Sequence, residues 1–572
     1  MKYKKHIAFT LSLLFAISPF SITTAFAEDT NVEIAEEIIF VHPNDLTLIE
    51  GNWYNRINLW REDIEQFRDA IVNSHPRFWD DEAIVVPTEW LFGQRSFIRH
   101  PWNTFEDNVE MQERFLNGID SLIFNIGILS DIEIFTELRR LATFLEDGHF
   151  VITLFDENSY VYPIAFKWLG GDGGGFYLLS AAEEFEEYLN KVVVQINGID
   201  IGSILDKFYS IGFSENRFSN RFFLEENLNS PYYLAFLGFF DEEIWGIENN
   251  EIILTLEDSE QNRHDMVLTL DDLFLIDEDN RDGVVDFPAI SVDIEELPRF
   301  LRRQGYNSFY ILEDYGILYI VLEEMDATLF NFSPQEIEEE GFDLVMVLDE
   351  VAAGITHLEL WEIFNQLDEA EDDDEIFDIV NDEFWNRIDN NLAPNQKIVD
   401  AINSGIVHTV IIDGRGNGGG NLSFLVNLFR FLDENIEDDN LFYFKDIRSF
   451  SAASVAAVIT EYLGGRTVGD PTGQNLIFHG TARGDDVGAR VADVILNNSR
   501  IYIQIPNFTA HLEQPDSYLG GIIINDVWEF IRRSPFLEQY AIWPTIDIDY
   551  TLEDWLNLND PLLEHIKDLV NN

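Results

Sequence analysis

Val410-Ile411-Ile412-Asp413-Gly414-Arg415-Gly416-Asn417-Gly418-Gly419-Gly420-Asn421 is the stretch of this chain that decides its fold. An apolar strand enters a glycine-rich turn, and a helical apolar pattern follows at Leu425, Leu428, Phe429 and Leu432. A strand, turn and helix in this order are the building block of an α/β domain. Closely spaced glycines also leave backbone amides uncovered, which suits an anion or an oxyanion. The plain alternative is a tight turn without chemistry.

The same turn satisfies the G-x-G-x-x-G spacing of dinucleotide-binding turns through Gly414, Gly416 and Gly419. We discount a dinucleotide because the pattern alone is weak and no acidic residue ends the next strand at the expected distance. We therefore expect no cofactor.

Strands and helices continue to alternate around this stretch from about residue 305. Apolar runs at 317–322, 407–412, 501–505 and 521–524 predict strands, and 422–432 predicts a helix. The acidic segment 326–400 interrupts this pattern, and we interpret it as an insertion with a solvated surface. The prediction is an α/β core over residues 305–572.

Two further regions precede this core. In the first, 28–155, the residues Trp60, Ile64, Phe67 and Ile71 share one helical face, and Ser130 to Glu133 form a capping box. That second helix must end by Asp147-Gly148, which places His149 just beyond it. The second region, 156–304, has short strand-like runs such as Val192–Ile196 before an Asn-Gly turn. The whole chain is thus predicted to be multi-domain α+β, with a small β-rich middle domain.

The N-terminus predicts export. A basic start, an apolar run from Ile7 to Phe20, and Ala25-Phe26-Ala27 are typical of a signal peptide spanning residues 1–27. No later stretch has about 18 uninterrupted apolar residues, so we expect no membrane insertion. The chain of 572 residues contains no cysteine, which excludes disulfides and a cysteine nucleophile. We expect a secreted protein.

The charge balance excludes nucleic acid as a partner. The chain carries 35 Lys+Arg against 106 Asp+Glu, a formal net charge of -71. The negative field of the chain would repel a polyanion such as DNA or RNA. A charge spread along the whole chain indicates surface adaptation, for example to salt, rather than a site.

A candidate nucleophile lies downstream of the glycine turn. Small residues surround Ser451 in Ser451-Ala452-Ala453-Ser454, and a helix-compatible run follows. A serine at a strand-to-helix junction is exposed and close to the positive end of the helix. Alone, this pattern is weak, because Ser and Ala beside Phe are usually packing residues.

Taken in order, these segments resemble the tail-specific, or C-terminal processing, serine peptidase family. The similar motifs are Asp413–Gly420, Ser451–Ser454 and Gly469-Asp470-Pro471-Thr472-Gly473, with the opening strand 315–320 and the closing segment 543–561. Leu145-Glu146-Asp147-Gly148-His149 is similar to the Asp-Gly-His motif of members with a helical leader. The resemblance covers most of residues 50–570. It implies a PDZ-like middle domain and a peptidase acting on polypeptides.

The chain departs from the family pattern at three positions. Gln474 stands where tail-specific members have their activating lysine, and no lysine lies between Lys445 and Lys567. Ser454 replaces the usual Glu, and Gly414 replaces a Leu. The resemblance then implies the branch of the family with a histidine base. The alternative is a catalytically inactive secreted binding protein on the same fold.

The site implied by the resemblance comprises Ser451 as nucleophile, His149 as base and Glu513 as the acid, with the amides of Gly419 and Ala452 holding the oxyanion. Asp470 is the second choice for the acid, His479 and His511 are fallback bases, and His408 is expected to pack. Imidazole titrates near neutrality, so activity should fall below about pH 6.5 as the base protonates. The negative field of the chain should raise that midpoint slightly.

We expect no metal site. The segment 277–283 looks like a calcium loop, but Ala289 occupies its twelfth position, where a bidentate Glu is required. Composition also leaves a paired-carboxylate glycosidase open, although no pair of carboxylates stands out. Nothing in the sequence indicates an oligomeric state.

Overall fold

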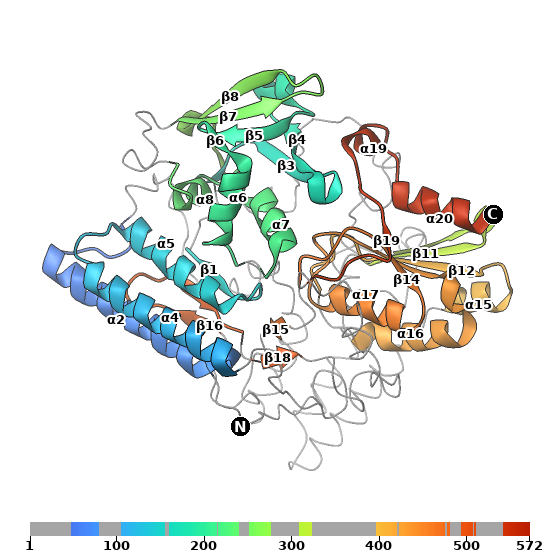
Figure 1. Cartoon of the computed structure of the whole chain (residues 1–572), viewed down its shortest axis with the longest axis horizontal. Coiled ribbons are helices and arrows are strands. Elements are labelled where there is room, and N and C mark those ends of the chain that lie inside the picture. The colour runs from blue at the N-terminus through green and yellow to red at the C-terminus, as the bar shows by residue number, and fades with distance from the viewer. Residues whose placement is uncertain are drawn as a thin grey trace, which may run out of the picture.

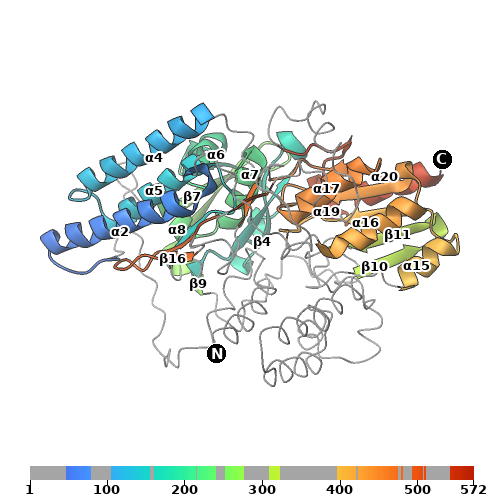
Figure 2. The ribbon, with the colours of Figure 1, turned by 90° about the horizontal axis from the view of Figure 1, so that it is seen from below.

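The computed structural model describes residues 47–78, 105–154, 160–213, 215–239, 251–275, 308–322, 396–419, 423–474, 478–480, 493–506, 508–510 and 541–571. Within these residues the chain forms an N-terminal helical part, a middle sheet with short helices, and a C-terminal layered part (Figures 1 and 2). The predicted α+β organisation with an α/β core is confirmed. The signal peptide 1–27, nearly all of the insertion 326–400 and the run 521–524 lie outside the described residues.

The C-terminal part is built on a six-stranded sheet of order β10-β11-β12-β13-β14-β19. Only β10 is antiparallel to its neighbour, and the other strands run parallel. The strands are β10 Ser308–Leu312, β11 Ile317–Val321, β12 Thr409–Asp413, β13 Leu441–Lys445, β14 Arg466–Gly469 and β19 Ile546–Asp547. Strands β11, β12 and β13 are buried throughout, as expected for a parallel sheet covered on both faces.

Helices cover both faces of this sheet (Figure 1). Because β12, β13 and β14 are neighbours in chain order, right-handed crossovers place α16 and α17 on one face. On the other face α20 packs Leu562 and Ile566 against the strands. The helices are α15 Gln396–Asn403, α16 Ser423–Asn435, α17 Ala452–Tyr462, α19 Leu552–Leu556 and α20 Pro561–Asn571. The loops after β12 and β13 therefore meet at the carboxyl edge of the sheet, where α/β proteins place their sites.

The N-terminal helical part consists of α2 Trp53–Ser74, α4 Phe105–Asn125 and α5 Asp131–Ala142. The predicted stripe of Trp60, Ile64, Phe67 and Ile71 is fully buried. Ser130 caps α5 in the predicted capping box. The helix ends earlier than expected, at Ala142, and a 3₁₀ turn Thr143–Leu145 carries the chain to Asp147.

The middle part contains a sheet of order β3-β4-β5-β7-β8, with β6 beside β5. Its strands are β3 Ile164–Leu169, β4 Gly175–Ala181, β5 Val192–Ile196, β6 Ile199–Asp200, β7 Glu251–Glu257 and β8 Arg263–Thr269. Three helices were not predicted here: α6 Ile201–Tyr209, α7 Arg217–Asn227 and α8 Pro231–Phe236. Two small pairings complete the described strands, β2 Tyr160–Val161 with β9 Phe274–Leu275, and β15 Phe478–Gly480 with β18 Phe508–Ala510.

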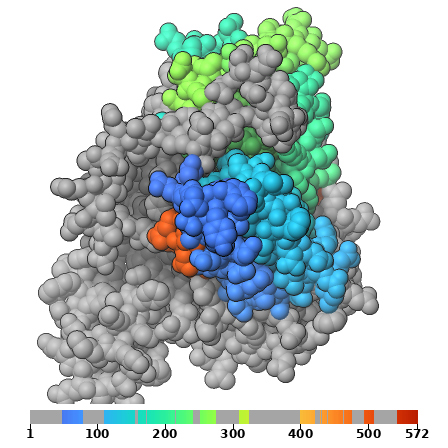
Figure 3. Space-filling view, turned by 90° about the vertical axis from the view of Figure 1, so that its left-hand side faces the viewer, coloured from blue at the N-terminus to red at the C-terminus, as the bar shows by residue number. Residues whose placement is uncertain are grey.

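One segment of the C-terminal region returns to the N-terminal helices. Strand β17 Tyr502–Gln504 pairs with β1 Val151–Thr153 on one side and β16 Asp493–Ile495 on the other. Buried Asp63 of α2 accepts from the backbone N–H of Asn498 at 3.0 Å and of Ser499 at 2.7 Å. The orange atoms of this segment lie against the blue helices in Figure 3. The helical part and the core are thus joined by a sheet placed directly after His149.

None of the helices within the described ranges combines the length and hydropathy that a membrane crossing requires.

Candidate active site

Ser451 lies in a strained turn between a strand and a helix. Strand β13 ends at Lys445, helix α17 begins at Ala452, and Ser451 between them has φ 51° and ψ -123°. Residues with a side chain rarely adopt this conformation, and where they do the strain often marks a functional position. A serine on a sharp strand-to-helix turn is also the arrangement that exposes the nucleophile of many hydrolases.

The glycine turn after β12 packs directly against this serine. Gly419 has φ 106°, and a Cβ atom there would lie 2.3 Å from the Cβ of Ser451 and 3.0 Å from the backbone nitrogen of Ala452. Any side chain at Gly419 would therefore displace Ser451. The Phe450 N–H donates to the Asn417 carbonyl at 3.0 Å, which fixes the two loops together.

The two amides expected to bind an oxyanion differ in this structure. The Gly419 N–H donates to Asn417 Oδ1 at 2.7 Å, within its own turn. Ala452 is the first residue of α17, where an amide has no acceptor inside the helix. The amide of Ala452 is thus available to an oxyanion, whereas that of Gly419 must first leave Asn417.

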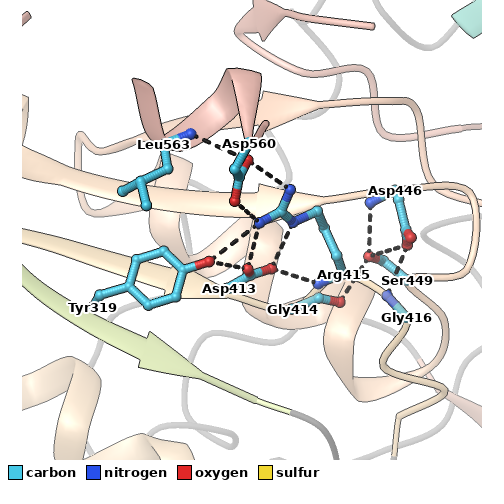
Figure 4. A network of polar contacts seen from close by, with 9 residues as sticks. All are labelled: Tyr319, Asp413, Gly414, Arg415, Gly416, Asp446, Ser449, Asp560 and Leu563. Atoms are coloured by element: carbon cyan, nitrogen blue, oxygen red, sulfur yellow. Dashed lines mark hydrogen bonds and ion pairs between the residues drawn. The ribbon is translucent and has the colours of Figure 1, made fainter. Parts of the chain in front are cut away.

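A buried ion network anchors the glycine turn (Figure 4). Arg415 pairs with Asp413 at 2.6 Å and with Asp560 at 2.8 Å, and the hydroxyl of Tyr319 donates to Asp413. Its carboxylate partners keep the pKa of Arg415 well above its usual range, although burial opposes this. The turn is therefore tied to the start of α20 as well as to its own strand.

The second loop is held by the same network. Asp446 accepts from the Gly416 N–H at 3.0 Å, and the Ser449 hydroxyl donates to the Gly414 carbonyl at 3.0 Å. Ser454, at the position of the family's Glu, donates to the Ser449 carbonyl at 2.9 Å and is buried. Its hydroxyl thus serves the geometry of the loop before Ser451.

His149 reaches the same place from the N-terminal part. Its ring lies 5.0 Å, between centroids, from that of Phe450, the residue before Ser451. Asp147 accepts the backbone N–H of His149 at 2.9 Å, and the side chain of Gln504 in β17 donates to the His149 carbonyl at 3.3 Å. Gly148 lies close to the same ring, because a Cβ there would lie 2.6 Å from Phe450 Cζ and would push against it.

Gln474 bridges the serine and the histidine. Its side-chain oxygen accepts the backbone N–H of Ser451, and its nitrogen lies 3.3 Å from His149 Nδ1. The side chain is fully buried. The position that holds a lysine in tail-specific peptidases is therefore in the site, as an amide in contact with both residues.

Glu215, which the sequence analysis missed, is a carboxylate in this cluster. Its Oε1 lies 3.9 Å from His149 Nδ1, and it accepts from the Gly148 N–H at 3.2 Å and from Gln474 Nε2 at 3.3 Å. It precedes Asn216, the N-cap of α7. No motif distinguishes it among 106 acidic residues, and only the long-range fold brings it to His149.

Two of the remaining predicted residues, Asp470 and His408, make their contacts outside this cluster. Asp470 lies beside Lys445, which donates to its carbonyl at 2.6 Å, and His408 contacts Thr409 Oγ1 at 3.1 Å, before β12. His479 falls in β15, of whose side chains nothing is described. Glu513 and His511 lie outside the described residues, as does the segment 277–283.

Burial lowers the pKa of His149 from its ordinary value, and the nearby charge of Asp147 only partly opposes this. The sequence-based expectation of a slightly raised midpoint is therefore wrong. Desolvation of the ring acts locally, whereas the field of distant surface carboxylates is screened. A neutral imidazole is the form that can accept a proton.

Three residues here have the composition of a metal site: Asp147, His149 and Glu215 have ligand atoms within 4.8 Å of one another. However, Asp147 accepts the backbone N–H of His149 through Oδ1, and its Oδ2 lies 3.0 Å from His75 Nε2. Glu215 accepts two further N–H groups. We therefore interpret the cluster as a hydrogen-bonded support for the histidine.

No protein-family model matches the chain, and no curated protein matches its sequence. Its fold is similar to solved structures of proteases. Mature CPAF complexed with lactacystin is 13% identical, with a TM-score of 0.45 over 90% of this chain and 98% of that one. The photosystem II D1 C-terminal processing protease is 12% identical, with a TM-score of 0.30 over 89% and 97%. A putative S41 protease from Bacteroides fragilis is 10% identical, with a TM-score of 0.30 over 88% and 97%.

Proposed function

We propose that this protein is a secreted serine endopeptidase of the tail-specific type, which hydrolyses polypeptides without a cofactor. The observation that carries the proposal is the meeting of three distant segments. Strained Ser451, the glycine turn at Gly419 and the half-buried imidazole of His149 converge at one edge of the sheet. A nucleophile, amide donors and a neutral base are the groups that acyl transfer requires.

The chemistry follows from these positions. Ser451 Oγ attacks the carbonyl carbon of the substrate while His149 takes the hydroxyl proton. The negative oxygen of the tetrahedral intermediate is held by the Ala452 amide and by the Gly419 amide once it leaves Asn417. His149 then passes the proton to the leaving amine, and an acyl-enzyme remains. Water, activated by the same imidazole, releases the acid product and restores Ser451.

Export is part of this proposal, since the basic start, apolar run and Ala25-Phe26-Ala27 favour a cleaved signal peptide ending at residue 27. A polypeptide substrate is supported by the ordered motifs from Asp413 to Gly473.

Hydrolysis of a casein-like protein by the purified chain tests the proposal, with Ser451→Ala and His149→Gln as variants. We expect measurable cleavage by the wild type and a loss of at least about 10³-fold in each variant. Matching unfolding temperatures would show that the variants remain folded. Cleavage that survives in Ser451→Ala would remove this serine from the mechanism, and a wild type without activity would favour the inactive binding protein.

A further inference from the structure

The orientation of the Gln474 amide determines which nitrogen of His149 carries the proton. Gln474 Nε2 lies 3.3 Å from both His149 Nδ1 and Glu215 Oε1, and its Oε1 accepts the Ser451 N–H. If the amide were flipped, its nitrogen would face the Ser451 N–H, so that two donors would meet. Its oxygen would face the Glu215 carboxylate, so that two acceptors would meet. With the amide as it stands, His149 Nδ1 accepts from Gln474 and the ring proton lies on Nε2, so this resting tautomer has no free nitrogen for the Ser451 proton.

This arrangement fits the resting ring, and the reactive ring must differ from it. To take the serine proton on Nε2, the ring must first carry its own proton on Nδ1. Both nitrogens carry hydrogen after the transfer, so Nδ1 needs an acceptor where the Gln474 donor now lies. Glu215 Oε1 is 3.9 Å from Nδ1, and its side chain is only 2% exposed. A slight shift of the amide would let Nδ1–H donate to this carboxylate, in surroundings where water screens the attraction little.

Among the described residues, the carboxylates facing His149 are Asp147 and Glu215. Asp147 is already bonded to the His149 backbone N–H and to His75 Nε2. It therefore holds the backbone of the histidine, whereas Glu215 lies toward the ring nitrogen.

We propose that Glu215 is the positioning carboxylate that accepts the Nδ1–H of His149 in its reactive and charged forms, with Gln474 as the amide that holds the resting tautomer between turnovers. This inference rests on the proposed function, and it assigns to the middle part of the chain a role that the resemblance gave to Glu513. Helix α7 fits that role because Asn216, its N-cap, also donates to the Thr472 carbonyl at 3.4 Å in the loop of Gln474.

The test compares pH profiles of kcat/KM for Glu215→Gln, Glu513→Gln and the control Glu146→Gln in the full chain. Gln at 215 keeps an oxygen for the Gly148 N–H and removes only the charge. We expect a loss of about 10²-fold or more, and an acid limb shifted to lower pH because the protonated ring loses its partner. Glu146 is exposed and pairs with Arg77, so its variant should match the wild type.

A double variant, Glu215→Gln with Gln474→Glu, separates positioning from a structural role. It returns one carboxylate to contact with Nδ1, and we expect it to move the acid limb back toward that of the wild type. The proposal is overturned if Glu215→Gln keeps the wild-type rate and profile, if the limb moves with Glu513→Gln instead, or if the double variant keeps the shifted limb. Each of these results leaves the proposed function standing as long as Ser451→Ala is inactive; an active Ser451→Ala contradicts the function itself.

Discussion

At the scale of single residues, the site depends on two backbone conformations that residues with side chains avoid. Ser451 has φ 51°, and Gly419 beside it has φ 106°. The first is occupied at a cost of roughly 1–3 kcal/mol, which the loops around it must offset. The second is open only to glycine in practice, because a Cβ there meets Ser451 Cβ at 2.3 Å.

Replacing Gly419 with Ala should therefore lower kcat/KM by about 10²-fold or more, since the new methyl group displaces the serine and the adjacent amide. Gly405→Ala is a matched control: Gly405 also has positive φ, at 74°, but nothing lies within 4 Å of its Cβ position. Gly405→Ala should lose less stability than Gly419→Ala in thermal unfolding, because only the methyl group at position 419 meets its neighbours, and only Gly419→Ala should lose activity. Equal activity in the two variants would contradict the close contact between Gly419 and Ser451.

The pKa of His149 sets the second prediction at this scale. Because burial lowers this pKa, the base stays neutral to a lower pH than an exposed histidine, and the acid limb of kcat/KM should lie below about pH 6.5. A pH–rate profile in constant salt measures the midpoint directly. A midpoint above about 6.5 would show that the carboxylates outweigh burial.

The resemblance to a known family was sufficient to name Ser451, the glycine turn and His149 as candidates, because each lies in a short motif that is similar to one of that family. It was insufficient for Glu215, which has no local signature. Its position depends on α7 docking against loops more than two hundred residues away, as the bond from Asn216 to Thr472 shows. The direction of the pKa of His149 likewise depends on burial, which no local pattern reveals.

At the scale of elements, the carboxyl end of β13 is held by a buried lysine. Lys445 is fully buried, and its Nζ donates to the carbonyls of Asp470 at 2.6 Å and Ile542 at 2.7 Å. Burial lowers the pKa of Lys445 to about 7. Lys445 thereby joins the strand before Ser451 to the loop that carries Gln474.

Lys445→Met should lower the free energy of unfolding by about 2 kcal/mol, because two carbonyls lose their donor. Since the folded-state pKa lies below the unfolded one, the unfolded chain binds more protons between about pH 7 and 10.5. The wild type should thus gain stability relative to the variant as pH rises through that window. Urea unfolding at several pH values measures both effects, with Lys567→Met as a surface control. A stability difference that is absent, or that shrinks with rising pH, would contradict this role.

Helices and strands with a clear hydrophobic period were predicted from the sequence, whereas the pairing of short strands was not. The stripes of α2 and α5 and the apolar strands β11 and β12 follow from local sequence. Strand β17 was also predicted, from the apolar run 501–505, but its pairing with β1 was not, because β1 is three residues long and lies far from β17 in the chain. Such strands form only when the surrounding parts have already brought them together.

At the scale of the whole molecule, the net charge of -71 should act on the choice of substrate. Its field attracts basic peptides and repels acidic ones, and salt screens both effects. The ratio of kcat/KM between a Lys-containing and a matched Glu-containing peptide should exceed one at low salt and fall as salt rises. A neutral peptide of the same length is the reference. A ratio that does not change with salt would assign any preference to contacts in the site instead.

The whole fold also explains why the site needs all three parts of the chain. The core provides Ser451 and the glycine turn, the helical part provides His149, and α7 of the middle part provides Glu215. Strand β17 helps to hold His149 in place, since Gln504 donates to the His149 carbonyl.

The most direct test of the central claim is covalent labelling of the purified protein with a fluorophosphonate probe, followed by mass mapping of the adduct. The probe reacts with a serine hydroxyl only where a base and oxyanion donors activate it. We predict one adduct, on Ser451, that is absent in Ser451→Ala and strongly reduced in His149→Gln. An adduct on another residue, or labelling that persists in Ser451→Ala, would contradict the assignment of Ser451 as the nucleophile.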